Sequence, residues 1–249
     1  MSSLFSNNFL PVVLIVALCP GSLAATQHIP DSPLSPQLPL LFEQNQGQFN
    51  ESVDYVARGK GYSIVLGQQP VIELYRFSST ASAPGADPDA NVGPDVQLDS
   101  VAKLRLNIHG ARENATATPL ERQQALTNYL TGDPSGWKTG IENFMRVRYN
   151  QVLPDIDVEY YGRDGRLEYD FVVHPGGDPG SIEFSIEGAQ GLSVNEQNGL
   201  VIDLGGKQIV QHAPVSWQLT DSGQRIAVPS SYSVSGDIVR LQVDAWDPA

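Results

Sequence analysis

The sequence predicts an all-β, antiparallel fold that is sandwich-like or divided into two β lobes, with short turns and little helix. The 249 residues include 23 Gly and 18 Pro, which is typical of a chain with many turns. Short runs of alternating apolar and polar residues recur between GG, DSG and SGD turns. Apolar residues at 41% and charged residues at 17% exclude a wholly disordered chain and allow a substantial core.

The alternating runs follow one another at the short spacing that is typical of a β-sandwich or barrel. The runs that predict strands are Tyr62–Leu66, Val71–Phe77, Ala102–Ile108, Asn143–Tyr149, Ile156–Tyr161, Leu167–Val173, Ile182–Ile186, Leu200–Leu204, Val215–Leu219, Ser231–Val234 and Ile238–Val243. Only Leu120–Leu130 has helical character, and its Asn-Tyr pair near a glycine argues against a helix.

The N-terminal segment has the pattern of a secretory signal peptide over residues 1–24. Phe9–Leu18 reads FLPVVLIVAL, an apolar run that is too short to span a bilayer. A Pro-Gly pair and the small-residue site Ser22–Ala24 follow, so cleavage is expected after Ala24, or alternatively after Ala25. Because MSSLFSNN contains no Lys or Arg, an uncleaved apolar anchor remains the alternative. The pattern predicts a protein that is secreted or held at the cell surface.

Cysteine usage and charge exclude several classes of function. The single cysteine, Cys19, lies inside the expected signal, so we expect neither disulfides nor thiol chemistry in the mature chain. No second apolar segment is long enough to span a membrane after signal cleavage. The net charge of -13 gives nucleic acids and anionic lipids no attraction.

The mature chain divides into three parts by composition. Residues 25–39 contain four prolines and form a Pro-rich lead-in. Residues 40–249 form the all-β domain, which the sequence allows to divide into lobes of about 40–135 and 136–249. Within it, residues 78–100 are rich in Ser, Ala, Pro and Asp and are expected to form a disordered loop.

A hairpin around Asp164-Gly165 can be predicted in most detail, because a DG pair between alternating runs is a strong turn signal. A two-residue turn there places Tyr161 opposite Glu168 and Glu159 opposite Asp170. One face is then entirely apolar and is expected to lie in the core. It contains Ile156, Val158, Tyr160, Leu167, Tyr169, Phe171 and Val173.

The other face of the hairpin is acidic. It gathers Asp155, Asp157, Glu159, Glu168 and Asp170. Carboxylates this close repel one another unless cations lie between them. Arg146 and Arg148 alternate with apolar residues on the preceding strand, so we predict a structural charge cluster of arginine and carboxylate. A metal or sugar site on the same carboxylates is the alternative.

Several segments resemble the N-terminal domain of unknown function in bacterial secreted proteins that carry SBBP (β-propeller-type) repeats. The segments are FEQNQGQF (42–49), VDYVARGKGYSIVL (53–66), LRLNIHGA (104–111), TNYLTGDPSGW (127–137) and FMRVRYNQVLPDIDVEYYGRDGRLEYDFVVHPGGDP (144–179). The resemblance implies a domain that precedes tandem repeats on an exported protein and has no assigned catalytic residues. Relatives run on beyond the position of Ala249, so a fragment, a truncated product or a stand-alone copy is expected.

The common catalytic arrangements are missing from the sequence. The four histidines form no HxH or HExxH pair, and there is no G-x-S-x-G or phosphate-binding G-x-x-x-x-G-K motif. Asp87, Asp89 and Asn91 copy the first three ligand positions of an EF-hand loop, and they are weak calcium candidates because Val92 and Leu98 replace its Gly and Glu. We therefore expect no catalytic residues and no cofactor.

These observations favour an exported, non-catalytic module for surface display, adhesion or binding, whose partner is a surface glycan or protein. The alternative is a secreted glycan-acting hydrolase or carbohydrate-binding module that uses the acidic hairpin 155–170. Such a hydrolase needs two carboxylates across a cleft. A carbohydrate-binding module needs exposed aromatic rings, for which Trp137, Trp217, Trp246, Tyr160 and Tyr161 are candidates.

Overall fold

The computed structural model describes the backbone and side chains of residues 39–59, 62–67, 103–206, 208–220, 222–244 and 246–247, and the backbone alone of 12–19 and 72–76. The predicted loop 78–100, with Asp87, Asp89 and Asn91, lies outside the described residues. So does most of the lead-in 25–39.

The described residues form strands and two short 3-10 turns, η1 (Pro134–Gly136) and η2 (Pro179–Ser181). The strands are β1 (Val12–Cys19), β2 (Phe42–Gln44), β3 (Val53–Gly59), β4 (Tyr62–Gly67), β5 (Ile72–Arg76), β6 (Leu104–Ile108), β7 (Thr116–Tyr129), β8 (Lys138–Leu153), β9 (Ile156–Arg163), β10 (Arg166–Val173), β11 (Glu183–Glu187), β12 (Gly191–Val194), β13 (Leu200–Asp203), β14 (Gln208–Gln211), β15 (Val215–Leu219), β16 (Arg225–Val228), β17 (Ser230–Ser235) and β18 (Ile238–Val243).

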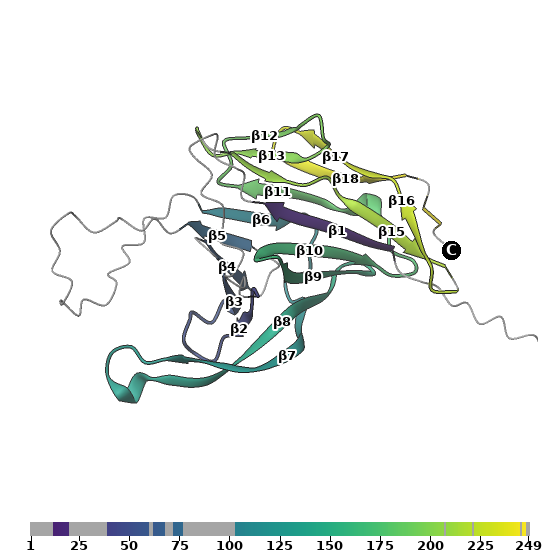
Figure 1. The fold of residues 1–249 in the computed structure, drawn as a ribbon. Coiled ribbons are helices and arrows are strands. Elements are labelled where there is room, and N and C mark those ends of the chain that lie inside the picture. Colours follow the sequence, from purple (N-terminus) through teal and green to yellow (C-terminus); the bar gives the residue numbers. More distant parts are fainter. Residues whose placement is uncertain are drawn as a thin grey trace, which may run out of the picture.

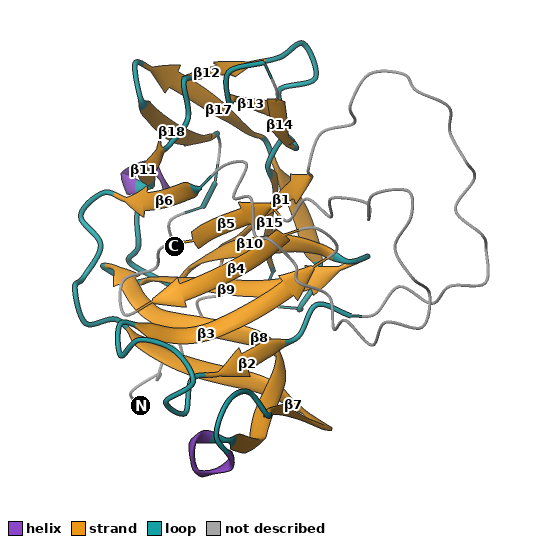
Figure 2. Cartoon of the chain, turned by 90° about the vertical axis from the view of Figure 1, so that its left-hand side faces the viewer, coloured by secondary structure: helices purple, strands orange, loops and turns teal. Residues whose placement is uncertain are grey.

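Neighbouring strands pair in antiparallel fashion throughout the described part of the chain. One path of paired strands runs β17-β18-β11-β6-β5-β4-β3-β2-β8, and it continues β8-β9-β10-β1-β15-β16. The strands β12, β13 and β14 form a smaller sheet, and the end of β1 pairs with β14. The path curls, so that β12–β18 lie on one side of the molecule and β2, β3, β7 and β8 on the other (Figures 1 and 2). The fold is all-β and antiparallel, as predicted.

A long hairpin of β7 and β8 extends from the body of the molecule, with η1 at its tip (Figure 1). The stretch Leu120–Leu130, which alone had helical character in the sequence, is strand through Tyr129. Pairing with β8 outweighs the helix propensity of these residues, although the register shifts between Arg122 and Leu126 and again between Thr127 and Tyr129. Leu126, Leu130 and Trp137 are exposed along this hairpin.

One hydrophobic core joins the two sides of the molecule. It includes Phe42 and Phe144 from β2 and β8, and also Tyr232 and Leu241 from β17 and β18. The predicted apolar face of the β9–β10 hairpin lies inside this core. Its seven residues are each no more than 2% exposed: Ile156, Val158, Tyr160, Leu167, Tyr169, Phe171 and Val173.

Gly162 on β9 is required by the close passage of Leu40, which is 1% exposed. A Cβ added at Gly162 would lie 2.4 Å from the Cβ of Leu40 and 3.2 Å from its Cα. We expect Gly162→Ala to lower the free energy of unfolding by ~1 to 3 kcal/mol, because overpacking forces the backbone to shift. Urea denaturation measures the effect. Gly136→Ala is the control, since a Cβ there has no neighbour within 4 Å; equal midpoints for the two variants would contradict the packing.

Candidate functional site

The predicted charge cluster lies on the outer face of β8, β9 and β10. A two-residue turn joins β9 to β10, with positive φ at Asp164 (51°) and Gly165 (69°). The ladder pairs Tyr161 with Glu168 and Glu159 with Asp170, so the register predicted from the DG pair is confirmed. Because opposite residues share a face, the acidic side chains gather on the side of the sheet away from the core.

Glu159 is the centre of the charge cluster, and its side chain is buried. The Nη1 atom of Arg146 donates to Glu159 Oε1 at 2.6 Å. The Nε and Nη2 atoms of Arg148 both donate to Glu159 Oε2, at 2.9 and 2.6 Å. Arg146 also reaches Glu121 on β7, with its Nε atom 2.9 Å from Oε1. Two guanidinium groups therefore neutralise one buried carboxylate on the sheet face.

Asp157 is bound at the other end of β9 by different groups. Its Oδ1 accepts the backbone N–H of Gln151 at 2.7 Å, and its Oδ2 lies 2.8 Å from Nε2 of His174. Asp155, which the sequence placed on the acidic face, lies instead in the turn before β9 with φ 55°. Its carbonyl accepts the backbone N–H of His174. The two aspartates thus fix the ends of β9 and β10 together.

Glu168 and Asp170 lie on β10, on the side of the hairpin away from the arginines of β8. The hydroxyl of Tyr161 donates to Asp170 Oδ1 at 2.9 Å. The guanidinium of Arg146 stacks over the Tyr161 ring, 4.5 Å from its centroid. Arg163 Nη1 lies 3.2 Å from Glu168 Oε2, which is buried and has no hydrogen-bond partner. The two carboxylates of β10 are therefore less fully bound than that of Glu159.

Burial raises the pKa of Asp170 to about 7. The negative charges of Glu159 and Glu168 contribute to this raised pKa, whereas the Tyr161 hydrogen bond and Arg146 oppose it. Desolvation disfavours the charged form of a carboxyl group, which is why its effect dominates here. The protonation of Asp170 therefore changes near neutral pH.

The pH dependence of stability should report this raised pKa. Between the ordinary value of 3.8 and about 7, folded Asp170 holds a proton that the unfolded chain has released, so its contribution to stability falls as the pH rises. We expect Asp170→Asn to remove a loss of ~1 to 3 kcal/mol between pH 4 and 7. Urea unfolding of both proteins across this range measures it. Parallel stability curves for the two proteins would contradict the raised pKa.

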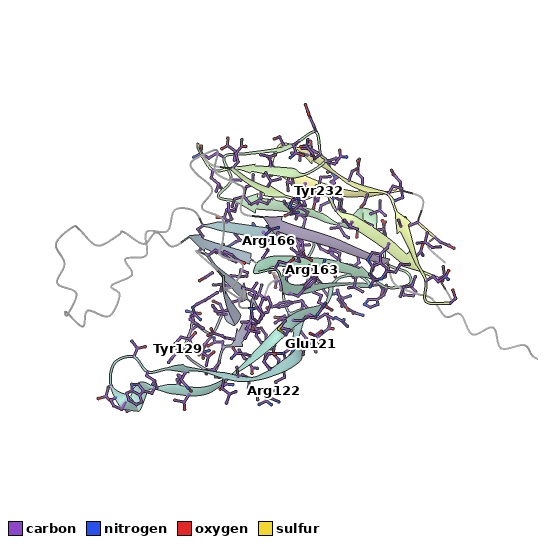
Figure 3. All side chains as sticks on the ribbon, in the orientation of Figure 1. Glu121, Arg122, Tyr129, Arg163, Arg166 and Tyr232 are labelled. Carbon is purple, nitrogen blue, oxygen red and sulfur yellow. The ribbon has the colours of Figure 1, made fainter. Side chains whose placement is uncertain are left out.

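The structure brings together all six residues of the predicted cluster, Arg146, Arg148, Asp157, Glu159, Glu168 and Asp170, on one sheet face. Glu121 and His174 were not predicted as partners in this cluster. His174 could have been found by extending the alternation of β10 by one residue beyond Val173. Glu121 could not have been found from the sequence, because its place beside Arg146 depends on the pairing of β7 with β8. Figure 3 labels Glu121, together with Arg163 and Arg166 at the ends of the β9–β10 hairpin turn.

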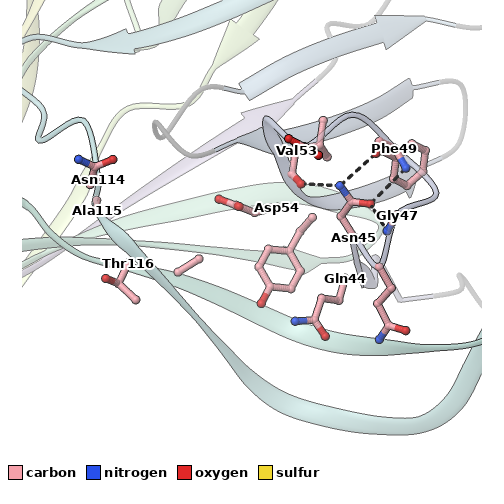
Figure 4. Close-up of a pocket in the computed structure, with 13 residues that line it drawn as sticks. Gln44, Asn45, Gly47, Phe49, Val53, Asp54, Asn114, Ala115 and Thr116 are labelled. Carbon is pink, nitrogen blue, oxygen red and sulfur yellow. Dashed lines mark hydrogen bonds between the residues drawn. The ribbon is translucent and has the colours of Figure 1, made fainter.

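A second feature is the loop after β2, which contains residues 45–48 with the sequence NQGQ and is called the NQGQ loop. The Nδ2 atom of Asn45 donates to the carbonyls of Val53 and Asn50, at 2.8 and 2.9 Å. Its Oδ1 accepts the backbone N–H groups of Gly47 and Phe49, at 3.0 and 3.1 Å. The side-chain amide of Asn45 therefore bonds to backbone groups of this loop in place of a β-ladder (Figure 4).

This loop borders an open hollow of about 660 Å³. The lining is mostly polar, and it consists of Gln44, Asn45, Gln46, Gly47, Phe49, Glu51, Val53, Asp54, Tyr55 and Asn114–Ala117 (Figure 4). Burial raises the pKa of Asp54, an effect that the hydrogen bond from the Tyr149 hydroxyl partly offsets. Amide, carboxyl and aromatic groups in a hollow of this size can bind a polar ligand.

The aromatic candidates for sugar stacking differ in their exposure. Tyr160 and Tyr161 are buried, so neither offers a ring face to a ligand. Trp217 lies under Arg225, whose guanidinium carbon is 4.0 Å from the ring centroid, and Trp246 packs against the core. Trp137 is 42% exposed near the tip of the β7–β8 hairpin.

Two features are absent from the described residues. In that part of the chain, no three His, Cys, Asp or Glu side chains are arranged so that they could hold a metal ion. The same residues contain no helix with the length and hydropathy needed to cross a membrane.

Comparison with protein families identifies a family for this chain. A family model described as Domain of unknown function (DUF7948) matches residues 42–249. The chain belongs to this family. The DUF7948 region contains the whole charge cluster and the NQGQ loop, and it begins at the first residue of β2, after β1. No curated protein and no solved structure matched the chain.

Proposed function

We propose that this DUF7948 chain is an exported, non-catalytic binding module that is displayed at the cell surface or outside the cell. The observation that carries the proposal is that the charged side chains on the outer face of β8, β9 and β10 bind one another. Arg146 and Arg148 bind Glu159, and His174 binds Asp157, all on one sheet face. Charges that neutralise one another in this way serve the stability of a sheet face.

The open hollow beside the NQGQ loop supports a binding role. Its amide side chains, with Tyr55 and Asp54, can donate and accept hydrogen bonds, as recognition of a surface glycan or a polypeptide requires. The expected association with SBBP repeats, and with bacterial surface proteins, belongs to the same proposal. It would place the module at the start of a longer exported protein.

Export is tested by the N-terminus of the protein recovered outside the cytoplasm. We expect it to start at Ala25 or Thr26, because Ser22–Ala24 and Ala25 offer the small residues that signal cleavage needs. The matched control is Leu14→Arg, which interrupts the apolar run and should keep the protein inside the cell. Exported material that still begins at Met1 would overturn this part of the proposal.

The alternative is a glycan hydrolase, and one observation favours it. Asp170 has a pKa of about 7, and a general acid needs a pKa close to the working pH. The geometry argues against a hydrolase. Asp170 and Glu159 lie directly opposite one another on one ladder, whereas glycoside hydrolysis needs carboxylates on two sides of the scissile bond.

The two functions are separated by incubating the purified protein with polymeric surface glycans. The module should bind without releasing new reducing ends, and Gln46→Ala in the hollow should weaken binding more than Asp170→Asn does. Release of reducing ends that Asp170→Asn abolishes, at a melting temperature no lower than that of the wild type, would establish the hydrolase instead. Calorimetry measures binding, and a reducing-end assay measures cleavage.

A further inference from the structure

The strand β1 lies in the middle of the sheet and has a neighbour on each side. Its residues Val12–Ala17 pair with Val173–Glu168 of β10, and Val12–Ile15 pair with Gln218–Val215 of β15. Both ladders are antiparallel, and Figure 1 places β1 beside β10 and β15. The backbone groups of β10 and β15 that face each other are therefore satisfied through β1.

The same residues form the apolar run of the expected signal peptide, and the family model begins only at residue 42. Cleavage after Ala24 would leave β10 and β15 each with an unpaired edge inside the sheet. The edge of β10 carries Tyr169 and Phe171, whose side chains are fully buried in the core. An open slot with exposed backbone and core side chains is a ready template for another strand.

The register fixes what such a strand must carry on its inner side. Residues directly opposite one another on a ladder share a face. Occupant positions opposite Val173, Phe171 and Tyr169 therefore face the core and must be apolar.

The outer side of the slot has the opposite requirement, because it presents Asp170 and Glu168 of β10. Both side chains are buried, and Glu168 Oε2 has no hydrogen bond although Arg163 lies 3.2 Å away. In β1 the residues opposite these carboxylates are Ile15 and Ala17, which carry no charge. A Lys or Arg at either position would lie directly opposite a buried carboxylate.

The other edge of the same hairpin already has this arrangement. The strand β8 pairs with β9, and it directs Val147 and Tyr149 into the core, where both are fully buried. Its alternate residues, Arg146 and Arg148, bind Glu159 on the outer face. The acidic face thus receives cations from β8 on one side and none from β1 on the other.

We propose that the slot between β10 and β15 is an acceptor site for an extended segment of a partner polypeptide, in which apolar residues alternate with Lys or Arg. The apolar residues would lie opposite Tyr169 and Phe171, and the cations opposite Asp170 and Glu168. The proposal rests on the proposed export, because signal cleavage empties the slot. Before cleavage, β1 occupies it.

The test begins with the full chain, so that the protein folds with β1 in place. A specific protease site is placed within residues 20–38, and the folded protein is cut there. Labelled peptides are then added at a urea concentration below the unfolding transition. They carry the sequence of residues 12–19 with Cys19→Ser, either alone or with Ile15→Lys or Leu14→Lys. Fluorescence anisotropy measures their binding.

Each lysine peptide exchanges one of two isomeric aliphatic residues for Lys, so the main difference between them is the face that receives the charge. We expect the Ile15→Lys peptide to bind about tenfold more tightly than the unchanged peptide, and the Leu14→Lys peptide at least about tenfold more weakly. The gain should disappear when the protein carries Asp170→Asn and Glu168→Gln. Hydrogen exchange should slow in β10 and β15 when peptide is bound.

Three results would overturn the proposal. They are failure of every peptide to enter the cut protein, equal affinity of the two lysine peptides, and light scattering that gives a dimer after β1 is removed, which would make a second copy the occupant. None of them depends on export, which N-terminal sequencing tests separately. Exported protein that keeps Met1 would refute the proposed export without any change in peptide binding.

Discussion

Phe171→Ala should lower the free energy of unfolding by ~3 to 5 kcal/mol, a large effect for a single substitution. The Phe171 side chain is fully buried, and its ring packs edge-on against Tyr169 with the centroids 5.8 Å apart. It lies opposite Val158 on the ladder, in the part of the core that β9 and β10 share. Truncation leaves a cavity that the surrounding rings cannot fill without rearranging.

Urea denaturation measures this prediction through the midpoint of the transition, at an unchanged slope. The control is Ile226→Ala on β16, because Ile226 is 56% exposed and its truncation should cost less than ~0.5 kcal/mol. A Phe171→Ala midpoint equal to that of Ile226→Ala would mean that the apolar face of the hairpin does not contribute to the core.

The β9–β10 hairpin could be predicted from the sequence to the level of individual residue pairs. Its DG turn fixes the register, and strict alternation then assigns each side chain to a face. The same alternation in β8 predicted that Arg146 and Arg148 share a face, and the structure brings both to Glu159. These inferences needed only local sequence, because a two-residue turn joins the paired strands.

The rest of the fold depends on contacts between distant segments. The stretch after Leu120 contains good helix formers, and its pairing with β8, which is interrupted by two register shifts, makes it a strand. The position of β1 depends on β10 and β15, which lie far along the chain. The NQGQ motif was recognised through its resemblance, but the bonds of Asn45 to Val53 and Phe49 emerge only once the loop has folded.

The charge cluster gives the second large effect. Replacing both Arg146 and Arg148 by Met should lower the free energy of unfolding by ~2 to 4 kcal/mol, because Glu159 then remains buried without a cation. The value is reduced from that of a fully buried pair, since the two arginine side chains are 34% and 36% exposed and water can reach them. The methionines retain most of the apolar contact of the arginine stems.

Thermal and urea unfolding of the double variant should be compared with Arg122→Met. Arg122 pairs with Glu142 and is 58% exposed, so its loss should cost only ~0 to 1 kcal/mol. The melts are repeated with calcium and with a chelator, because calcium is the competing cation for these carboxylates. If arginine neutralises the face, the wild-type melting temperature should be insensitive to calcium. A large rise with calcium, together with an unchanged double variant, would instead assign the carboxylates of β9 and β10 to a metal site.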